Sequence, residues 1–374
     1  MRFATAARFG PPRPVLPDRA ATGPGHAAPQ PASRLERVTG PTTLSQSEDC
    51  LHLNVWAPED ADSLPVLVFL HGGGYSAGSG GLPWYDGGLL AERGRMVVVT
   101  VNYRLGALGF AYLAELADDL GAGNFGLLDQ LAALRWVRAH IVEFGGDPDR
   151  ITAAGQSAGA YSIVALLSGD MAHGLFRAAI LQSLPSGLLP WQPAEATRIS
   201  RMLLDALDLA DAAELRTAAV ADVLVAQQEV ARQANLGVVP PFHLVADGDL
   251  VAADPLRVVG ERGGDGVRIM LTFTREEGQA FAPDADELTE RFFHAPGRRF
   301  ADLLTQQGNP PEWYEFGWSP PGSPFGACHC IELPFVFGTL DAWRDAPMLA
   351  GADPGELAGL VDDVQNRWIS FVHG

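Results

Sequence analysis

The stretch Gly155-Gln156-Ser157-Ala158-Gly159 decides the fold of this chain. It follows an apolar, strand-like run at residues 151–154 and precedes a helix-like run at residues 161–167. A G-x-S-x-G pattern between a strand and a helix is typical of a serine on a tight, strained bend, where side chains on the flanking glycines would crowd the turn. A strand-to-helix turn made only of small residues fits the pentapeptide equally well. The rest of the chain must therefore supply the partners that a nucleophilic serine needs.

Length and composition suggest a globular protein with a sizeable core. The chain has 374 residues, 47% of them hydrophobic and 19% charged, which suits one large α/β domain or two modest ones. The formal net charge of −19 argues against nucleic acid or an anionic membrane as a partner. The longest apolar runs, 64–70 and 96–101, are far shorter than a membrane span, and the N-terminus lacks the apolar region of a signal peptide.

The cysteines favour a reducing compartment. There are three, Cys50, Cys328 and Cys330, and such a small, odd number indicates a cytoplasmic protein rather than a disulfide framework. Cys328 and Cys330 flank His329, but no fourth metal ligand lies at a sensible spacing. We therefore expect neither a metal site nor a cofactor.

Apolar strands alternate with helical runs along most of the chain. This alternation predicts an α/β fold with a mostly parallel central sheet flanked by helices and with reactive residues at the carboxyl ends of the strands. Residues 1–45 are rich in Pro, Gly and Ala and are predicted to form an extended arm on the surface. The expected strands are 51–56, 65–70, 96–102, 151–154, 178–181, 269–273 and 313–318, and the expected helices are 88–93, 124–139, 161–167, parts of 194–230, 285–304 and 356–372.

A glycine-rich segment upstream of the serine can supply oxyanion donors. His71-Gly72-Gly73-Gly74 directly follows the apolar strand 65–70. Bare glycine N–H groups can approach a substrate oxygen closely, and together with the N–H of Ala158 they would form an oxyanion hole. A flexible glycine turn is the alternative interpretation, but the G-x-S-x-G pattern at this spacing favours the oxyanion hole.

The base and the acid should follow the serine in the order acid, then histidine. His329 stands out because it lies in a loop after the last expected strand, beside small residues. Glu276 and Glu277 both follow strand 269–273, and only the glycine after Glu277 favours the second. The histidines downstream of the serine are His173, His243, His294, His329 and His373.

Several motifs together resemble the type-B carboxylesterase/lipase family, which includes the cholinesterases and bacterial para-nitrobenzyl esterases. The resemblance extends, with gaps, from about residue 2 to residue 368. It implies an α/β-hydrolase fold in a single domain spanning 1–374, with helical lid and pocket insertions at about 190–310. The matching stretches are 47–55, 71–75, 102–106, 123–130, 144–148, 155–159, 326–329 and 332–338.

The resemblance also implies roles for particular residues. It makes Ser157 the nucleophile, His329 the base and Glu277 the acid that orients the imidazole. Ester hydrolysis would then proceed through an acyl-enzyme intermediate. The implied oxyanion donors are the N–H groups of Gly73, Gly74 and Ala158.

Two further pairs match positions with supporting roles in the family. Ser183 and Glu332 match buried polar residues near the histidine, and Arg8 and Glu48 match an ion pair that ties down the N-terminal arm.

The chain also departs from the family pattern. The strands that usually precede Arg2 are absent, the segment between Glu277 and His329 is short, and the chain stops at Gly374 where relatives continue. We therefore expect a reduced lid and an open active site. No tryptophan precedes Trp56, so the choline-binding indole of the cholinesterases has no counterpart and a choline-ester specialist is excluded.

The function expected from the sequence is a serine hydrolase that cleaves carboxylic esters with short- to medium-chain acyl or aryl groups. The alternatives are a non-catalytic binding protein of the same fold and a hydrolase of amides or lactones. The expected partner is a small-molecule ester, and monomer and homodimer both remain open.

Overall fold

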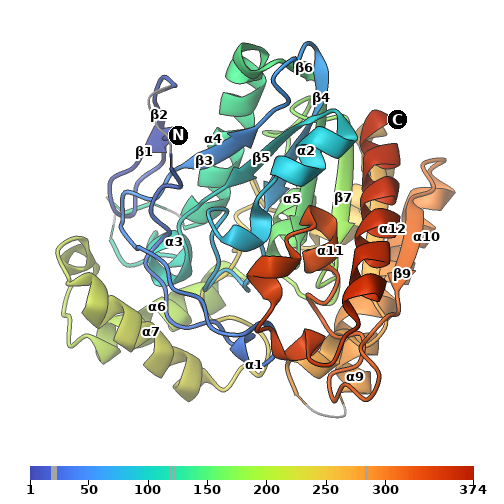
Figure 1. The fold of residues 1–374 in the computed structure, drawn as a ribbon. Helices are drawn as coiled ribbons and strands as arrows, with labels where there is room; N and C mark the ends of the chain where they lie inside the picture. Colours follow the sequence, from blue (N-terminus) through green and yellow to red (C-terminus); the bar gives the residue numbers. More distant parts are fainter. Residues whose placement is uncertain (18–22, 118–119, 122, 283–284) are drawn as a thin grey trace.

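The computed structural model describes residues 1–17, 23–117, 120–121, 123–282 and 285–374. Its centre is a seven-stranded sheet in the order β3-β5-β4-β6-β7-β8-β9 (Figure 1). β3 is antiparallel to β5, and all other neighbouring pairs are parallel, which confirms the predicted mostly parallel sheet. The strands are β3 (Leu53–Trp56), β4 (Leu64–Leu70), β5 (Val97–Val101), β6 (Gly146–Gln156), β7 (Ala178–Gln182), β8 (Arg268–Thr274) and β9 (Glu312–Phe316).

The central strands are apolar throughout because both faces of the sheet are covered. Along β4, Val66 and Val68 pack into one hydrophobic core, whereas Leu67 and Phe69 pack into another on the opposite face. This division follows from the alternation of side chains along a strand. All four side chains are fully buried, as expected of a parallel sheet between two layers of helices.

Two sets of helices cover the sheet. The first core includes side chains from α3 (Gly106–Phe110), α4 (Phe125–His140), α5 (Ala158–Ser168), α8 (Pro255–Glu261) and α10 (Ala295–Gln306). The second includes side chains from α2 (Gly88–Gly94), α11 (Leu333–Phe337) and α12 (Pro354–His373). α6 (Pro193–Ala206) and α7 (Val220–Ala234) pack against each other at one corner of the molecule (Figure 1).

The last helix shows how local sequence sets an element and its buried face. The side chain of Asp353 accepts a hydrogen bond from the N–H of Glu356, and Pro354 occupies the first turn, so the helix begins with two favourable residues. Val361, Val364 and Trp368 then follow at spacings of three and four residues and are buried. This spacing places them on one stripe, which packs into the second core.

The N-terminal arm contributes more to the interior than the sequence predicted. It contains β1 (Ala4–Thr5), β2 (Arg13–Pro14) and α1 (Glu36–Thr39), and Phe3, Phe9 and Val38 are buried in the two cores. The predicted ion pair is present: Arg8 Nε donates to Glu48 Oε2 at 2.7 Å. Its guanidinium also donates to two backbone carbonyls just before α7. Isolated apolar residues in an aperiodic segment give no sequence signal of burial.

The range 190–310 is helical in large part but is not only an insertion. It contains α6, α7, α8 and α10, and it also includes β8, which pairs with β7 and β9 inside the sheet.

Within the described ranges, no helix is both long and apolar enough to traverse a lipid bilayer.

Candidate active site

The serine lies on a sharp bend between β6 and α5. β6 ends at Gln156 and α5 begins at Ala158, so Ser157 alone turns the chain. Its backbone dihedrals are φ 54° and ψ −120°, a conformation that is strained for a residue with a side chain. The Ser157 N–H donates to the carbonyl oxygen of Gln182 at 2.8 Å, which fastens the bend to the end of β7.

The two glycines of the motif are sterically required. A Cβ atom on Gly159 would lie 2.0 Å from the carbonyl oxygen of Leu70, and one on Gly155 would lie 2.4 Å from the carbonyl carbon of Gly159. Both distances are far inside van der Waals contact. The helix can therefore start directly above the sheet only with glycine at these positions, which explains why G-x-S-x-G specifies this turn.

Neighbouring strands bring three polar residues to one edge of the sheet. β6, β7 and β8 are adjacent and parallel. Ser157 follows β6, Ser183 follows β7 and Glu277 follows β8 after a short turn. Because parallel strands end at the same edge, residues far apart in sequence meet there.

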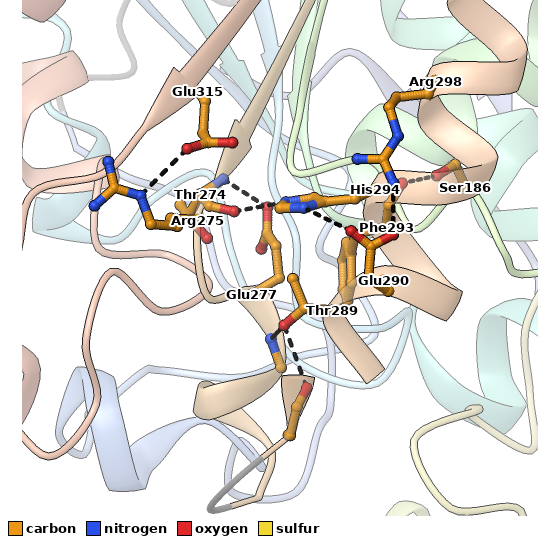
Figure 2. A network of polar contacts seen from close by, with 12 residues as sticks. Ser186, Thr274, Arg275, Glu277, Thr289, Glu290, Phe293, His294, Arg298 and Glu315 are labelled. Carbon is orange, nitrogen blue, oxygen red and sulfur yellow. Dashed lines mark hydrogen bonds and ion pairs between the residues drawn. The ribbon is translucent and has the colours of Figure 1, made fainter. Parts of the chain in front are cut away.

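Glu277 and His329 form a completely buried pair. The Nδ1 atom of His329 lies 2.5 Å from Glu277 Oε2, and both side chains are 0% exposed. The backbone N–H of Thr274, at the end of β8, donates to Glu277 Oε1 at 2.8 Å (Figure 2). With both carboxylate oxygens occupied, Nδ1 is the protonated nitrogen that donates to Glu277, and Nε2 is left as an acceptor.

Gln156 occupies the other side of the imidazole. Its Nε2 atom lies 3.1 Å from His329 Nε2, so the amide N–H donates to the unprotonated ring nitrogen. Among the hydrogen bonds of the described residues, none joins Ser157 to His329. No sequence signal indicated this contact, although Gln156 lies inside the motif itself.

The glycine loop presents free backbone donors beside the serine. Gly73 and Gly74 have φ values of 108° and 60°. Among the hydrogen bonds of the described residues, none uses the N–H of Gly73, Gly74 or Ala158. All three residues line the same cavity as Ser157.

His71 anchors the base of this loop. Its ring stacks on Tyr103 with centroids 4.3 Å apart, and its Nδ1 lies 2.8 Å from the carbonyl oxygen of Gly72. Burial lowers the pKa of His71 to about 4, so the ring is neutral near pH 7 and Nδ1–H is the donor. The Tyr103 hydroxyl donates to the His71 carbonyl at 2.7 Å. Together these contacts hold the start of the glycine loop in place.

A cavity of about 360 Å³ opens above the serine. Apolar side chains form most of its wall, and two aromatic rings of that wall, Phe281 and Phe293, flank His329 with centroids 5.4 and 5.3 Å from the imidazole. A volume in this range suits a small molecule. Other apolar residues of the wall are Leu188, Leu236, Val239, Pro240, Phe242 and Phe292.

The model of the carboxylesterase family matches residues 1–288. The chain belongs to the carboxylesterase family. A probable N-octanoylanthranilate hydrolase of Rhodococcus erythropolis is 40% identical over 100% of this chain and 88% of its own length. The para-nitrobenzyl esterase of Bacillus subtilis (strain 168) is 34% identical over 94% of this chain and 79% of its own length.

Solved structures agree with this assignment. A thermophilic PNB esterase superposes with a TM-score of 0.90 at 32% identity, covering 100% of this chain and 86% of that one. The fold is therefore the predicted α/β-hydrolase fold, and the protein is a serine hydrolase of carboxylic esters.

The structure distinguishes between the two adjacent glutamates of the carboxylesterase. Glu276 is half-buried and accepts a hydrogen bond from the N–H of Ala327 at 2.6 Å. It therefore holds the loop that carries His329, whereas Glu277 contacts the imidazole itself.

Among the hydrogen bonds of the described residues, none joins another of the downstream histidines to Glu277 or Ser157. His243 Nδ1 contacts the carbonyl oxygen of Leu244 at 3.0 Å, and burial lowers the pKa of His243 to about 3. His294 Nε2 contacts the Thr274 carbonyl at 2.9 Å (Figure 2). His373, the last residue of α12, contacts the Gly94 carbonyl through Nε2 at 2.7 Å.

Ser183 and Glu332 are bonded to each other beside the Glu277–His329 pair. The Ser183 hydroxyl donates to Glu332 Oε1 at 3.1 Å, and Glu332 Oε2 has no hydrogen-bond partner among the described residues. Burial, and after it the charge of Glu277, raises the pKa of Glu332 to about 7. The carboxyl group is thus held partly protonated near neutral pH.

The cysteines around His329 are buried and free. Burial raises the pKa of both the Cys328 and the Cys330 thiol, so both stay protonated near pH 7. Among the described residues, no group of three or more His, Cys, Asp or Glu side chains is arranged to hold a metal ion.

Proposed function

We propose that Ser157 is the nucleophile of this carboxylesterase, that His329 is its base, and that Glu277 holds the imidazole in the required tautomer. The observation that carries the proposal is the buried hydrogen bond between Glu277 and His329 Nδ1. This bond leaves Nε2 unprotonated, so that this nitrogen, which contacts Gln156 next to the serine, can accept a proton.

The first half of the reaction forms the acyl-enzyme. The Gln156 amide gives up its contact with Nε2, and the Ser157 hydroxyl donates there instead; contacts of this kind commonly tighten only when substrate is bound. Oγ attacks the ester carbonyl carbon while its proton passes to Nε2. The N–H groups of Gly73, Gly74 and Ala158 hold the oxyanion, and losing one such donor costs about 3 kcal/mol of transition-state stabilisation. Collapse breaks the ester bond, and the leaving alcohol takes the proton from Nε2.

The second half regenerates the enzyme. Water loses a proton to Nε2 and attacks the acyl carbon, and the carboxylic acid leaves as Oγ regains its proton. The 360 Å³ apolar cavity supports a short- to medium-chain acyl or aryl substrate.

Active-site labelling tests the nucleophile. A fluorophosphonate probe should add one mass increment to the wild type, on the peptide that contains Ser157, and none to Ser157→Ala. The variant should also lose turnover of 4-nitrophenyl butyrate while its circular dichroism spectrum is unchanged. Substantial turnover by folded Ser157→Ala would refute the assignment.

The adjacent glutamates form a matched pair for testing the acid. Glu277→Gln should lower kcat by about 10³-fold or more because the imidazole loses its orienting carboxylate. Glu276→Gln removes only the loop contact and should have a much smaller effect. The reverse ranking would assign the acid to Glu276.

A second candidate function is the hydrolysis of N-acyl aromatic amides. It is favoured by the relative of 40% identity, whose name specifies an N-octanoyl substrate. Release of 4-nitroaniline from 4-nitrobutyranilide by the wild type, and its loss in Ser157→Ala, would support amide hydrolysis. Turnover of 4-nitrophenyl butyrate without any turnover of the anilide would exclude it.

We also propose that the enzyme works in the cytoplasm. The support is the three buried, free thiols, which suit a reducing compartment. Fractionation of the source cells with activity staining tests this location.

A further inference from the structure

The cavity above Ser157 has an unusual charge pattern for so acidic a protein. The chain carries a formal net charge of −19. Among the described residues that line the cavity, none is Asp or Glu, and the single ionic side chain is Arg34. The rest of the wall is apolar or neutral, so one guanidinium dominates the local electrostatics of the cavity.

Arg34 lies close to the oxyanion loop. Its Nη2 atom is 3.1 Å from the position that a Cβ on Gly74 would occupy, and a Cβ on Gly72 would lie 3.0 Å from Ser157 Cβ. Arg34 and Ser157 line the same cavity of about 360 Å³, so one small ligand can contact both residues.

The guanidinium has spare hydrogen-bonding capacity. Its side chain donates to the Val238 carbonyl at 3.2 Å, whereas a guanidinium carries five N–H donors. Among the described residues, no carboxylate forms an ion pair with it. Desolvation by the surrounding protein lowers the pKa of Arg34, although the residue is exposed overall and lines the cavity.

Two other arginines, Arg8 in the arm and Arg104 after β5, differ from Arg34. Arg8 binds the carboxylate of Glu48, and Arg104 binds that of Asp129 through two of its nitrogens. Both of these arginines join parts of the protein. Arg34 instead lines the cavity and has no carboxylate partner among the described residues.

We propose that Arg34 binds a carboxylate of the substrate, so that this carboxylesterase favours esters carrying an acidic group near the scissile bond. The inference rests on the hydrolytic site proposed above. A planar guanidinium pairs with a carboxylate through two parallel hydrogen bonds, and the apolar wall accommodates the hydrocarbon part of such an ester. Arg34 is thereby a specificity-determining residue that touches the substrate without taking part in proton transfer.

Matched pairs of esters test the proposal. One pair, phenyl butyrate and 3-carboxyphenyl butyrate, differs by a carboxylate on the leaving group. A second pair, phenyl valerate and monophenyl glutarate, carries the carboxylate on the acyl side. For each pair, pH-stat kinetics give the ratio of kcat/KM for the charged ester to that for the neutral ester.

Arg34→Gln should lower this ratio about 10- to 100-fold in at least one pair, because a charge-assisted contact is lost. The affected pair identifies the side of the ester that carries the acid. Arg34→Lys should retain part of the ratio, since it keeps the charge but not the planar fork. Arg201→Gln, which removes an exposed arginine of α6, should leave the ratio unchanged.

Two outcomes overturn the inference. If Arg34→Gln lowers turnover of charged and neutral esters equally in both pairs, the arginine only ties the arm to the loop at Val238. If the wild type hydrolyses none of the four esters, the proposed function has failed, and calorimetry then decides about Arg34. The wild type should bind 3-propoxybenzoate at least tenfold more tightly than Arg34→Gln does, with no such difference for 3-propoxybenzamide. If the wild type and Arg34→Gln bind the benzoate equally, the proposed carboxylate site is refuted.

Discussion

The imidazole of His329 lies between a hydrogen-bond acceptor on one side and a hydrogen-bond donor on the other. Glu277 accepts from Nδ1, and the neutral amide of Gln156 donates to Nε2. In the mechanism proposed above, this amide stabilises the unprotonated Nε2 and must give way there to the Ser157 hydroxyl. That mechanism implies that the charge of the side chain at position 156 should matter more than its size.

Gln156→Glu should move the acidic limb of the kcat/KM profile to higher pH by about one unit, because a carboxylate next to Nε2 favours the protonated ring. Turnover of 4-nitrophenyl butyrate at pH 6 should fall about tenfold, with a smaller loss at pH 8.5. The neutral variant Gln156→Met should keep the wild-type limb. An equal shift in both variants would show that the amide acts through packing alone.

Glu332 should make the stability of the protein depend on pH. Its pKa rises from an ordinary 4.5 to about 7 in the folded state, so between these values the folded state holds a proton that the unfolded state releases. The stabilisation is complete below about pH 4.5 and is lost as pH rises to about 7. Urea unfolding at several pH values should show that Glu332→Gln removes this decline in stability, whereas Glu312→Gln, at an exposed position, keeps it. If stability depends on pH in the same way in both variants and in the wild type, this prediction is wrong.

At the scale of elements, the turn from β6 into α5 requires two positions that have no room for a side chain. The N-terminal end of α5 lies directly against the end of β4, where Gly159 faces the carbonyl of Leu70. Glycine is an unfavourable helix residue in general, so its presence in the first turn of α5 indicates close contact. Gly359 in α12 offers the contrasting case, because no atom lies within 4 Å of an added Cβ there.

Two glycine-to-alanine variants should therefore have opposite effects. Gly359→Ala should stabilise the protein by about 0.5–1 kcal/mol, since alanine favours an open helical position. Gly159→Ala should destabilise it by several times that amount, on the order of 3 kcal/mol, and should reduce esterase activity more than a hundredfold because the bend must move. Thermal unfolding and 4-nitrophenyl butyrate kinetics measure both effects, and a neutral Gly159→Ala would show that the turn tolerates displacement.

At the scale of the whole molecule, one buried ion pair joins three segments of the chain. Arg104 follows β5, binds Asp129 of α4 at 2.7 Å and also donates to the Gly10 carbonyl of the arm at 2.8 Å. Asp129 is fully buried, and burial raises its pKa although the guanidinium opposes the shift. Desolvation thus offsets much of the attraction, as is common for buried pairs.

Breaking this pair should cost more than replacing it. Asp129→Asn leaves a buried, unpaired cation and should lower the free energy of unfolding by about 3–5 kcal/mol, whereas Arg104→Met combined with Asp129→Leu should recover a large part of that loss. Urea unfolding of the three proteins measures both quantities. A double variant that is less stable than Asp129→Asn would mean that the Arg104 contacts with the arm outweigh the ion pair.

The sequence by itself determined the sheet, the serine bend and the glycine loop. These features are set by rules that act over a few residues: uniformly apolar strands need cover on both faces, and the turn admits only glycine two residues before and two residues after Ser157. The carboxylesterase resemblance added a predicted role for His329. It also predicted the ion pair of Arg8 with Glu48, and the structure contains that ion pair.

Only the tertiary structure shows that Glu277 rather than Glu276 contacts His329, that Gln156 lies against the same ring and that Arg34 lines the cavity. Adjacent residues after a strand point in different directions, and which of them meets a distant loop depends on the backbone of the turn and on packing around it. Arg34 belongs to an aperiodic arm whose position is set by contacts with segments some two hundred residues away, such as Val238. Local sequence rules do not encode such distances, because the partners come together only when the whole chain folds.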